Sequence, residues 1–410
     1  MNDIASNAVE TADIQPKARR LSLPEFIFAH WLQRVRAGRL TVKFPSGALK
    51  VFGGAEPGPQ ASIEIRNLRL AFRMLVSGDI GFAEGYMEGD WDTPDLNAVL
   101  TLGVLNAQTL SKALAPSWSA RLMNRLRHVR RANTREGSRR NIAAHYDLGN
   151  AFYGQWLDET ISYSAALFDT MDEAHTPAQR RKYLRLAQAL DLRPGDRVLE
   201  IGCGWGGFAE IAAAEFGCEV VGLTLSVEQA AFAKARMARA GLADKVDIRV
   251  QDYRDVTGKF DKVVSIEMFE AVGEENWATY FDVLDRRLKP GGRAALQVIT
   301  IADEGFESYR RNPDFIQLYI FPGGMLPGPS AFGQAVSDAG LKIADAFYFG
   351  KSYAESLRRW DSAFRENWPQ IKAQGFDQRF FRMWRYYLCY CEVGFDHDRI
   401  DVGQFVIERA

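Results

Sequence analysis

The stretch that most constrains this chain is Val198–Ala212, with the sequence VLEIGCGWGGFAEIA. A short apolar run carries Glu200 near its end, and a helical pattern with Phe208 and Ala212 on one face begins soon afterwards. This order predicts a strand, a glycine-rich turn and a helix that ends near Gly217. The turn holds four glycines within six residues, namely Gly202, Gly204, Gly206 and Gly207.

Glycines in such a turn let the backbone bend sharply and approach a ligand that a Cβ atom would exclude. A string of this kind is equally typical of dinucleotide sites, so it does not identify the ligand by itself. Here Glu200 stands before the first glycine, which gives the pattern E-x-G-C-G-x-G. The turn therefore predicts a small-molecule site at the carboxyl end of a strand.

Length and composition set the outer limits on what this chain can be. At 410 residues it is long enough for two or three domains, and its net charge of −1 excludes a general polyanion binder. The four cysteines form no C-x-x-C pair, so we expect no disulfide framework and no metal site. The start lacks the apolar core of a signal peptide, and no apolar run is long enough to cross a bilayer. We expect a cytoplasmic protein that meets lipid only from the surface, at the inner face of the membrane.

The first part of the chain reads as a smaller α+β domain over residues 21–115, after a polar N-terminus at 1–20 that we expect to be mobile. Leu21–Val35 is an aromatic-rich helix candidate, whose apolar side chains either pack into this domain or touch lipid. Alternation over Arg39–Phe52 predicts a hairpin, and the period of Leu96–Leu114 predicts one helix.

Residues 116–140 are predicted to form a basic linker. Eight arginines lie between positions 121 and 140, Arg130 and Arg131 among them, against Glu136 alone. Such a run suits a solvated helix between domains, or a surface that attracts anionic phospholipid headgroups with about 1 kcal/mol per basic residue. No nucleic-acid recognition motif accompanies it, so no nucleic-acid partner is expected.

From residue 141 to residue 410 the pattern predicts a doubly wound α/β domain, because short apolar strands alternate with helices. Ligands of such a sheet lie at the carboxyl ends of its strands. The segment at about 301–330, centred on Glu304–Gly324, interrupts the alternation and is expected to form a helical cover over the site. The predicted strands are Arg197–Ile201, Glu219–Leu223, Val246–Gln251, Phe260–Ile266, Gly292–Thr300 and Gly403–Ile407.

From roughly Leu21 to Arg409 the chain resembles the cyclopropane-fatty-acyl-phospholipid synthases, and its glycine turn resembles motif I of class I S-adenosylmethionine (SAM) methyltransferases. The resemblance implies a class I SAM-methyltransferase sheet and a lipid-binding N-terminal domain. It also implies transfer of the SAM methyl group to the cis double bond of a fatty acyl chain in membrane phospholipid. The matching strings are HYDLGN (145–150), YSAALF (163–168), EIGCGWGG (200–207), GLTLSVEQ (222–229), SIEMFEAVG (265–273), YIFPGGMLP (319–327) and DVGQF (401–405).

The same resemblance implies the cofactor contacts. The glycine turn should approach the methionine part of SAM, residues of the second strand end should lie by the ribose and adenine, and a tyrosine–serine pair should flank the carboxylate or amine. Thr224 and Gln229 also suit ordinary helix capping, which is the alternative interpretation. The implied contacts are Tyr163, Ser164, Gly202, Gly204, Thr224, Leu225, Gln229, Asp252 and Tyr253.

Methyl transfer to an alkene leaves a carbocation, which aromatic faces stabilise while water is kept away. We expect aromatic side chains of the C-terminal half to serve here, although core packing is the default for each of them. Tyr319 is the strongest candidate because it opens the YIFPGG string, and Tyr309 and Phe321 are expected to face substrate. The candidate cluster is Tyr309, Tyr319, Phe321, Phe347, Tyr348 and Trp360.

A base must then remove a proton. The family is thought to hold bicarbonate for this step, with residues that match Glu270 and Tyr319, a Cys and a His. Here Ala165 stands at the Cys position and Gln297 at the His position. These departures leave the base open, because Gln297 cannot become cationic. Glu270 either acts directly as the base or is a buried structural acid.

Three functions remain open. The first is a lipid methyltransferase, whose product is a cyclopropane if the proton leaves the new methyl group and a methyl-branched or methylene chain otherwise. The second is a SAM methyltransferase for a soluble small molecule. The third is a catalytically silent paralogue that binds SAM or lipid. The family is commonly dimeric, so a homodimer is a further expectation.

Overall fold

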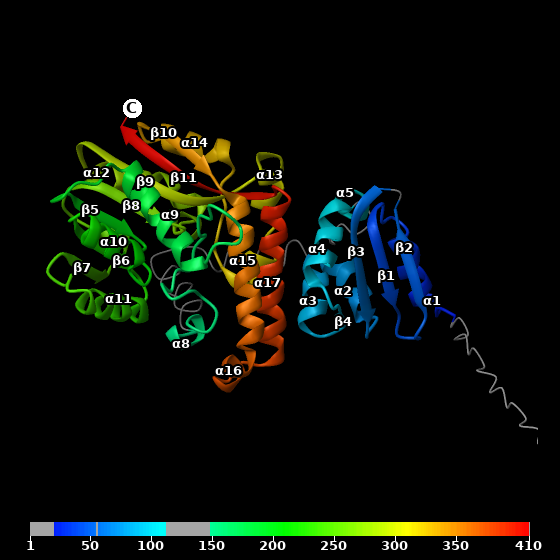
Figure 1. Ribbon diagram of the computed structural model, residues 1–410. Coiled ribbons are helices and arrows are strands. Elements are labelled where there is room, and N and C mark those ends of the chain that lie inside the picture. Colours follow the sequence, from blue (N-terminus) through cyan, green and yellow to red (C-terminus); the bar gives the residue numbers. More distant parts are fainter. Residues whose placement is uncertain (1–19, 55, 112–147, 410) are drawn as a thin grey trace, which may run out of the picture.

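The computed structural model describes residues 20–54, 56–111 and 148–409, which form two bodies lying side by side (Figure 1). A smaller N-terminal α+β domain ends at α5, and a larger α/β domain begins at α8. The predicted linker at 116–140, with Arg130 and Arg131, lies outside the described residues.

The N-terminal domain is built on a four-stranded sheet with the order β2-β1-β3-β4. The predicted hairpin is confirmed, because β1 pairs antiparallel with β2, while β3 pairs parallel with β1. The buried Glu25 joins the first helix to the hairpin turn by accepting from the backbone N–H groups of Ser22 and Ser46 at 2.7 and 2.8 Å. The elements are α1 (Leu23–Leu32), β1 (Ala37–Lys43), β2 (Leu49–Gly53), β3 (Glu56–Ile65), α2 (Arg69–Ser77), α3 (Asp79–Met87), β4 (Trp91–Asp92), α4 (Leu96–Leu105) and α5 (Ala107–Ser111).

The single helix predicted over Leu96–Leu114 is wrong, since the structure breaks it at Asn106 into α4 and α5. The side chain of Asn106 is buried and accepts from the backbone N–H groups of Arg36 and Ala37 at 2.6 and 2.9 Å. The amide of Asn106 also donates to the carbonyls of Ala37 and Leu102. A helix period cannot reveal this break, because the partners lie about seventy residues earlier in the chain.

The larger domain contains a seven-stranded sheet with the order β10-β11-β9-β8-β5-β6-β7. The five predicted strands from β5 to β9 pair in parallel, which confirms the doubly wound α/β class. The antiparallel β11 joins β9 to β10, an edge strand that the sequence analysis missed. The strands are β5 (Arg197–Ile201), β6 (Glu219–Thr224), β7 (Val246–Val250), β8 (Phe260–Ile266), β9 (Leu288–Ile301), β10 (Leu341–Tyr348) and β11 (Ile400–Arg409).

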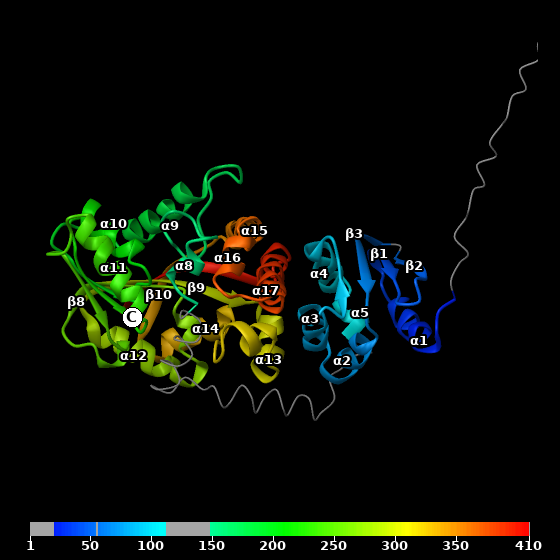
Figure 2. The same cartoon turned by 90° about the horizontal axis from the view of Figure 1, so that it is seen from below.

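Helices cover both faces of this sheet (Figure 2). On one face α9 and α10 pack with β5 around the buried Phe208, and on the other α12 and α14 pack around Phe281 and Phe332. The expected cover contains α13 and a short π-helical turn, η4. The helices are α8 (Asn150–Tyr153), α9 (His175–Ala189), α10 (Gly207–Glu215), α11 (Val227–Arg239), η1 (Tyr253–Asp255), η2 (Phe269–Ala271), η3 (Glu274–Asn276), α12 (Trp277–Arg287), α13 (Asp303–Arg311), η4 (Ile316–Ile320), α14 (Pro329–Asp338), α15 (Gly350–Glu366), α16 (Trp368–Ala373) and α17 (Gln378–Asp396).

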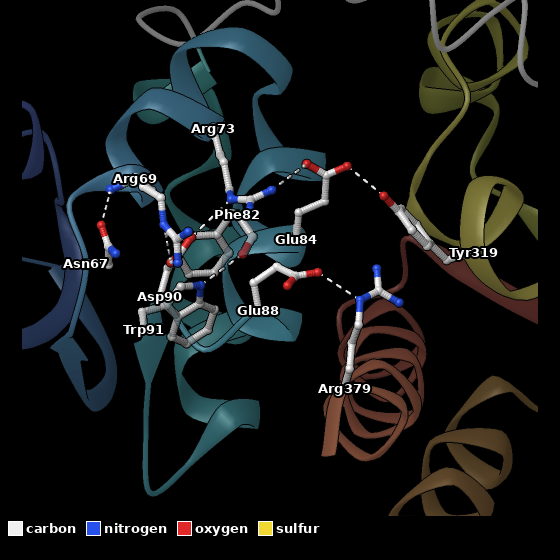
Figure 3. A network of polar contacts seen from close by, with 10 residues as sticks. All are labelled: Asn67, Arg69, Arg73, Phe82, Glu84, Glu88, Asp90, Trp91, Tyr319 and Arg379. Carbon is white, nitrogen blue, oxygen red and sulfur yellow. Dashed lines mark hydrogen bonds and ion pairs between the residues drawn. The ribbon is translucent and has the colours of Figure 1, made fainter. Parts of the chain in front are cut away.

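The long helix α17 packs against α15 on one side and against α3 and α4 of the N-terminal domain on the other. Polar contacts tie the two domains together (Figure 3). Arg379 donates to Glu88 at 2.8 Å, and the hydroxyl of Tyr319 donates to Glu84 at 2.6 Å. Deeper in the junction Arg382 donates to Asp92 at 2.8 Å. Among the described helices, none combines the length and apolarity that a bilayer crossing requires.

Candidate active site

The glycine-rich turn lies where β5 ends and α10 begins. Gly202, Gly204 and Gly206 have φ values of 84°, 51° and 83°, which disfavour any side chain. A Cβ on Gly202 would lie 2.7 Å from Cγ of Met268, whereas no described atom lies within 4 Å of a Cβ built on Gly204. The turn is therefore closed on one side and open on the other, as a ligand cradle requires.

The end of β6 supplies the second wall of this cradle. Thr224 and Gln229 are buried, and the hydroxyl of Thr224 donates to the Gln229 side-chain oxygen at 2.8 Å. Ser226 is the residue that caps α11, because its hydroxyl accepts from the Gln229 N–H at 3.2 Å. The Thr224 hydroxyl also accepts from the N–H of Ser226 at 3.1 Å, so its side chain stabilises the start of α11, while Leu225 beside it is partly exposed.

The end of β7 supplies the third wall. Asp252 caps η1 and accepts from the Arg254 guanidinium at 2.8 and 2.6 Å. Tyr253 packs edge-on against Tyr280, with ring centroids 5.4 Å apart. The predicted cofactor residues of three neighbouring strands thus meet at one edge of the sheet. A glycine turn with an open side, next to buried polar groups, fits the methionine and ribose parts of SAM.

The segment around Ser164 connects this cradle with the sheet centre. Lys182 of α9 is fully buried and donates to the Ser164 hydroxyl at 2.6 Å and to the Gln179 side-chain oxygen at 2.7 Å. Gln179 in turn donates to the Ser164 carbonyl at 2.9 Å. Next to them, the backbone N–H of the buried Ala165 donates to Oε1 of Glu267 at 2.9 Å.

Glu267 is the site residue that the sequence analysis missed. It follows β8 directly and has a φ of 49°, a strained value for a residue with a side chain. Its Oε1 accepts from the Ala165 N–H and from the Gln297 amide at 2.7 Å, and its Oε2 accepts from the Tyr353 hydroxyl at 2.7 Å. Gln297 itself is fully buried and accepts from Gln404 at 3.0 Å.

The charge state of Glu267 results from opposing effects. Burial raises the pKa of its carboxyl group, whereas the hydrogen bond from Tyr353, the charge of Lys182 and the other two donors lower it. Burial outweighs these donors, so the pKa of Glu267 lies above its ordinary value. An acidic residue three positions before Glu270 was the only signal in the sequence, since its partners come from three other segments.

Glu270 lies on η2 beside Glu267, and both line the same cavity. Its Oε1 accepts from the Ile299 N–H at 2.6 Å, while its buried Oε2 has no hydrogen-bond partner among the described residues. Burial and then the charge of Glu267 raise the pKa of Glu270 to about 8. Glu270 is therefore largely protonated at neutral pH.

These two carboxyl groups line an apolar cavity of about 1060 Å³. It runs from the inner face of the N-terminal sheet, past α2 and α4, to η4 and the ends of β9 and β11. Its volume lies at the upper end of the roughly 300–1,000 Å³ range of small-molecule sites. Such a long apolar space can hold a chain-like apolar ligand with one end against Glu267.

The structure places the predicted aromatic residues at several different sites. Tyr309, Phe321 and also Tyr163 line the cavity, with the Tyr163 hydroxyl 2.8 Å from that of Tyr387. Tyr319 is directed to Glu84 of the N-terminal domain instead of toward Glu267 (Figure 3). The expected six-residue cluster is wrong for three members: Phe347 and Tyr348 lie on the edge strand β10, and Trp360 is fully buried. Lining aromatics that the sequence analysis missed are Tyr353, Tyr386, Tyr387 and Tyr390.

Comparison with known proteins gives consistent matches. Residues 133–405 match the family described as mycolic acid cyclopropane synthetase. The chain is 40% identical over 365 residues to the tuberculostearic acid methyltransferase UfaA1 of Mycobacterium tuberculosis, covering 87% of this chain and 85% of that protein. It is 38% identical over 353 residues to the cyclopropane-fatty-acyl-phospholipid synthase of Escherichia coli K12, covering 85% and 88%.

Solved structures agree with these matches. The mycolic acid cyclopropane synthase CmaA1, in a complex with SAH and CTAB, superposes with a TM-score of 0.63 at 30% identity, covering 66% of this chain and 98% of that one. The cyclopropane synthase MmaA2 of Mycobacterium tuberculosis superposes with a TM-score of 0.62 at 29% identity, covering 66% and 97%. The chain therefore belongs to the mycolic acid cyclopropane synthetase family and is a SAM-dependent methyltransferase of the fatty-acid-modifying kind.

Proposed function

We propose that this protein transfers the SAM methyl group to the cis double bond of an unsaturated fatty acyl chain in a membrane phospholipid. The observation that carries the proposal is the apolar cavity lined by Glu267 and Glu270, which flank Met268, the residue packed against Gly202 of the glycine cradle. Similar proteins support it, since their names specify a tuberculostearic acid methyltransferase, a probable fatty acid methyltransferase and a cyclopropane-fatty-acyl-phospholipid synthase.

The residues of this chain would orient the alkene and keep water away. SAM supplies an electrophilic methyl group when it is bound in the glycine cradle. Because an alkene is a weak nucleophile, its π bond must be held close to that methyl group and in line with it. Tyr163, Tyr353 and Phe321 line the cavity near the carboxyl pair, and aromatic faces stabilise a nearby carbocation without reacting with it.

Glu267 is our candidate for the base. Its carboxylate accepts hydrogen bonds from the backbone N–H of Ala165 and from the amide of Gln297. The family resemblance assigned these two positions to a bicarbonate site. The residues present therefore do not fit a separate bicarbonate, and we assign no step to that ion. Glu270 is the weaker candidate, because its buried Oε2 has no donor among the described residues, whereas three donors hold the Glu267 carboxylate.

Three products follow from where Glu267 takes the proton and from whether a hydride shift comes first. If the proton leaves the new methyl group and the electron pair closes onto the cationic carbon, the product is a cyclopropane. If it leaves the acyl chain instead, the product is a methyl-branched alkene. A methylene group forms when a hydride shift precedes loss of a methyl proton. The proposal covers all three products. A deuterated methyl group on SAM distinguishes loss of a proton from the acyl chain from loss of a proton from the new methyl group.

The test is incubation of the purified protein with SAM carrying a fully deuterated methyl group and with phospholipid vesicles. One vesicle set carries cis-unsaturated chains and the matched set carries saturated chains. We expect deuterium in the unsaturated acyl chains alone, with all three deuterium atoms kept after chain deprotonation and two kept after methyl deprotonation. SAM binding by calorimetry without label in lipid would indicate a silent paralogue, and methylation of soluble amines or phenols alone would indicate a small-molecule enzyme.

A further inference from the structure

Exposed apolar side chains are concentrated in the N-terminal domain. Of the twelve large apolar side chains that are exposed among the described residues, eight lie in this domain, although it is much the smaller of the two. Scattered apolar side chains are normal on a protein surface, but a concentration of this kind marks an interaction site. The eight are Leu23, Phe26, Ile27, Leu49, Val51, Phe72, Leu75 and Leu105.

The first helix is apolar on opposite faces. Leu23, Phe26 and Ile27 follow helical spacing on its outer face and are 74%, 60% and 63% exposed. Phe28 and Trp31 of the same helix line the apolar cavity. A surface helix normally presents polar side chains to water, so this outer face is unlike that of a helix that only covers a core.

The second helix repeats the arrangement. Phe72 and Leu75 are 68% and 62% exposed, while Leu70 and Met74 line the cavity. Gly78 and Asp79 follow directly and also line it, so the end of α2 forms part of the cavity wall. Figure 2 shows α1 and α2 along one edge of the domain.

Exposed cations accompany these helices. Arg34 follows α1, and Arg39 and Lys50 lie on the neighbouring strands β1 and β2. Within the part of the chain that the structure describes, none of the three forms an ion pair. The nearby acids are engaged: Glu25 is buried and hydrogen-bonded, and Glu64 pairs with Lys43. Apolar side chains next to unpaired cations suit the headgroup region of an anionic membrane.

We propose that Leu23, Phe26, Ile27, Phe72 and Leu75, here called the docking face, insert into the interface of an anionic phospholipid bilayer. This inference rests on the proposed function, because an acyl chain must leave a bilayer to enter the cavity. The two helices of the docking face are also walls of that cavity, which a contact with a second copy of this chain would not require. Docking through α1 and α2 places two walls of the cavity next to the membrane surface.

The test measures binding of the full chain to vesicles of unsaturated phosphatidylglycerol and phosphatidylcholine by co-flotation. Two variants remove the docking face one helix at a time: Phe26→Ser with Ile27→Ser, and Phe72→Ser with Leu75→Ser. We expect each to weaken vesicle binding about tenfold, since less apolar surface is buried in the interface. The control is Met171→Ser, which removes an exposed apolar side chain of the other domain and should change nothing.

Three further measurements make the result decisive. The thermal unfolding midpoint of the full chain should be unchanged in both variants, which shows that the N-terminal domain still folds. If both variants bind vesicles as tightly as the wild type, the inference is overturned. If vesicle binding is unchanged but the variants lose self-association in sedimentation, the docking face contacts a second copy of this chain instead. If vesicle binding falls as expected but no lipid is ever labelled, the docking face stands and the proposed function fails.

Discussion

At the scale of single residues, Lys182 is the cation whose charge lowers the pKa of Glu267, an effect that ranks after burial and the hydrogen bond from Tyr353. It is fully buried, and its ammonium group donates to Ser164 and Gln179 instead of to a carboxylate. Burial lowers the pKa of Lys182 to about 8, while the charge of Glu267 acts in the opposite direction. Lys182 therefore links the segment that meets the cofactor with the carboxylate that we propose as the base.

Lys182→Met should move the acidic limb of the turnover–pH profile to higher pH by about one unit. Without the cation, the pKa of Glu267 rises and the carboxylate is ionised only at higher pH. The measurement is kcat over a pH series. Ser164→Ala is the matched control, because it removes the same hydrogen bond but keeps the charge. Ser164→Ala should raise KM for SAM and leave the acidic limb at its wild-type pH. An acidic limb at the wild-type pH in Lys182→Met would contradict the effect of Lys182 on Glu267.

Glu270 gives a second prediction, on stability. Its pKa is raised from 4.5 to about 8 in the folded protein. A raised carboxyl pKa means that its contribution to stability is fully present at low pH and is lost as pH rises through about 8. Glu270→Gln cannot ionise, so at pH 9 its free energy of unfolding should exceed that of the wild type by on the order of 2 kcal/mol. Denaturant unfolding from pH 5 to pH 9 checks this, and parallel curves would refute it.

At the scale of elements, Asn106 is what turns one predicted helix into two. Its side chain satisfies two backbone donors at the start of β1 and two carbonyls, all within the N-terminal domain. A helix could continue through this position, but the N–H groups of Arg36 and Ala37 would then be buried without partners. The break between α4 and α5 thus fixes the start of the N-terminal sheet.

Asn106→Ala should lower the free energy of unfolding by about 3 kcal/mol, because it leaves buried backbone donors unsatisfied. Chemical denaturation of the full chain is the measurement. The exposed Asn312 provides the control, since Asn312→Ala removes only an amide–carbonyl contact within its own turn and should cost far less. Equal losses of unfolding free energy in both variants would show that the buried hydrogen bonds of Asn106 stabilise the fold no more than the exposed hydrogen bond of Asn312.

Elements with strong local patterns could be predicted from the sequence, and elements with distant partners could not. The parallel strands were found because apolar runs mark strands buried on both faces. The edge strand β10 and the helix α14 were missed, since β10 carries no apolar run of buried residues and only Leu341 is buried along Leu341–Tyr348. The glycine cradle was predicted from its spacing, whereas Glu267 depends on Ala165 and Tyr353, about a hundred residues away on either side.

At the scale of the whole molecule, the junction between the domains forms part of the cavity. Residues of α2, α3 and α4 line the same space as Glu267 and Glu270, so the site is completed only when the domains are in contact. Tyr319 belongs to this junction, because its hydroxyl donates to Glu84. The family resemblance assigned Tyr319 to the base, and the two roles make different predictions.

Tyr319→Phe should lower turnover only a few-fold if the residue holds the domains together, whereas loss of a group that acts on the base would cost about 10²–10⁴-fold. Glu84→Gln weakens the same contact from the N-terminal domain. The double variant should be no slower than the slower single variant, since both remove one interaction. The measurement is kcat for the three variants, and a hundredfold loss confined to Tyr319→Phe would return Tyr319 to the catalytic group.

The most direct test of the account is the dependence of turnover on bicarbonate, compared between the wild type and Glu267→Gly. Glycine suits the φ of 49° and frees the donors of Ala165, Gln297 and Tyr353 for an anion. If Glu267 is the base, wild-type turnover is the same with and without bicarbonate. Glu267→Gly is then about a hundredfold slower without bicarbonate and recovers when it is added. A wild type that slows on bicarbonate removal, or a Glu267→Gly variant that turns over normally without it, would contradict the account.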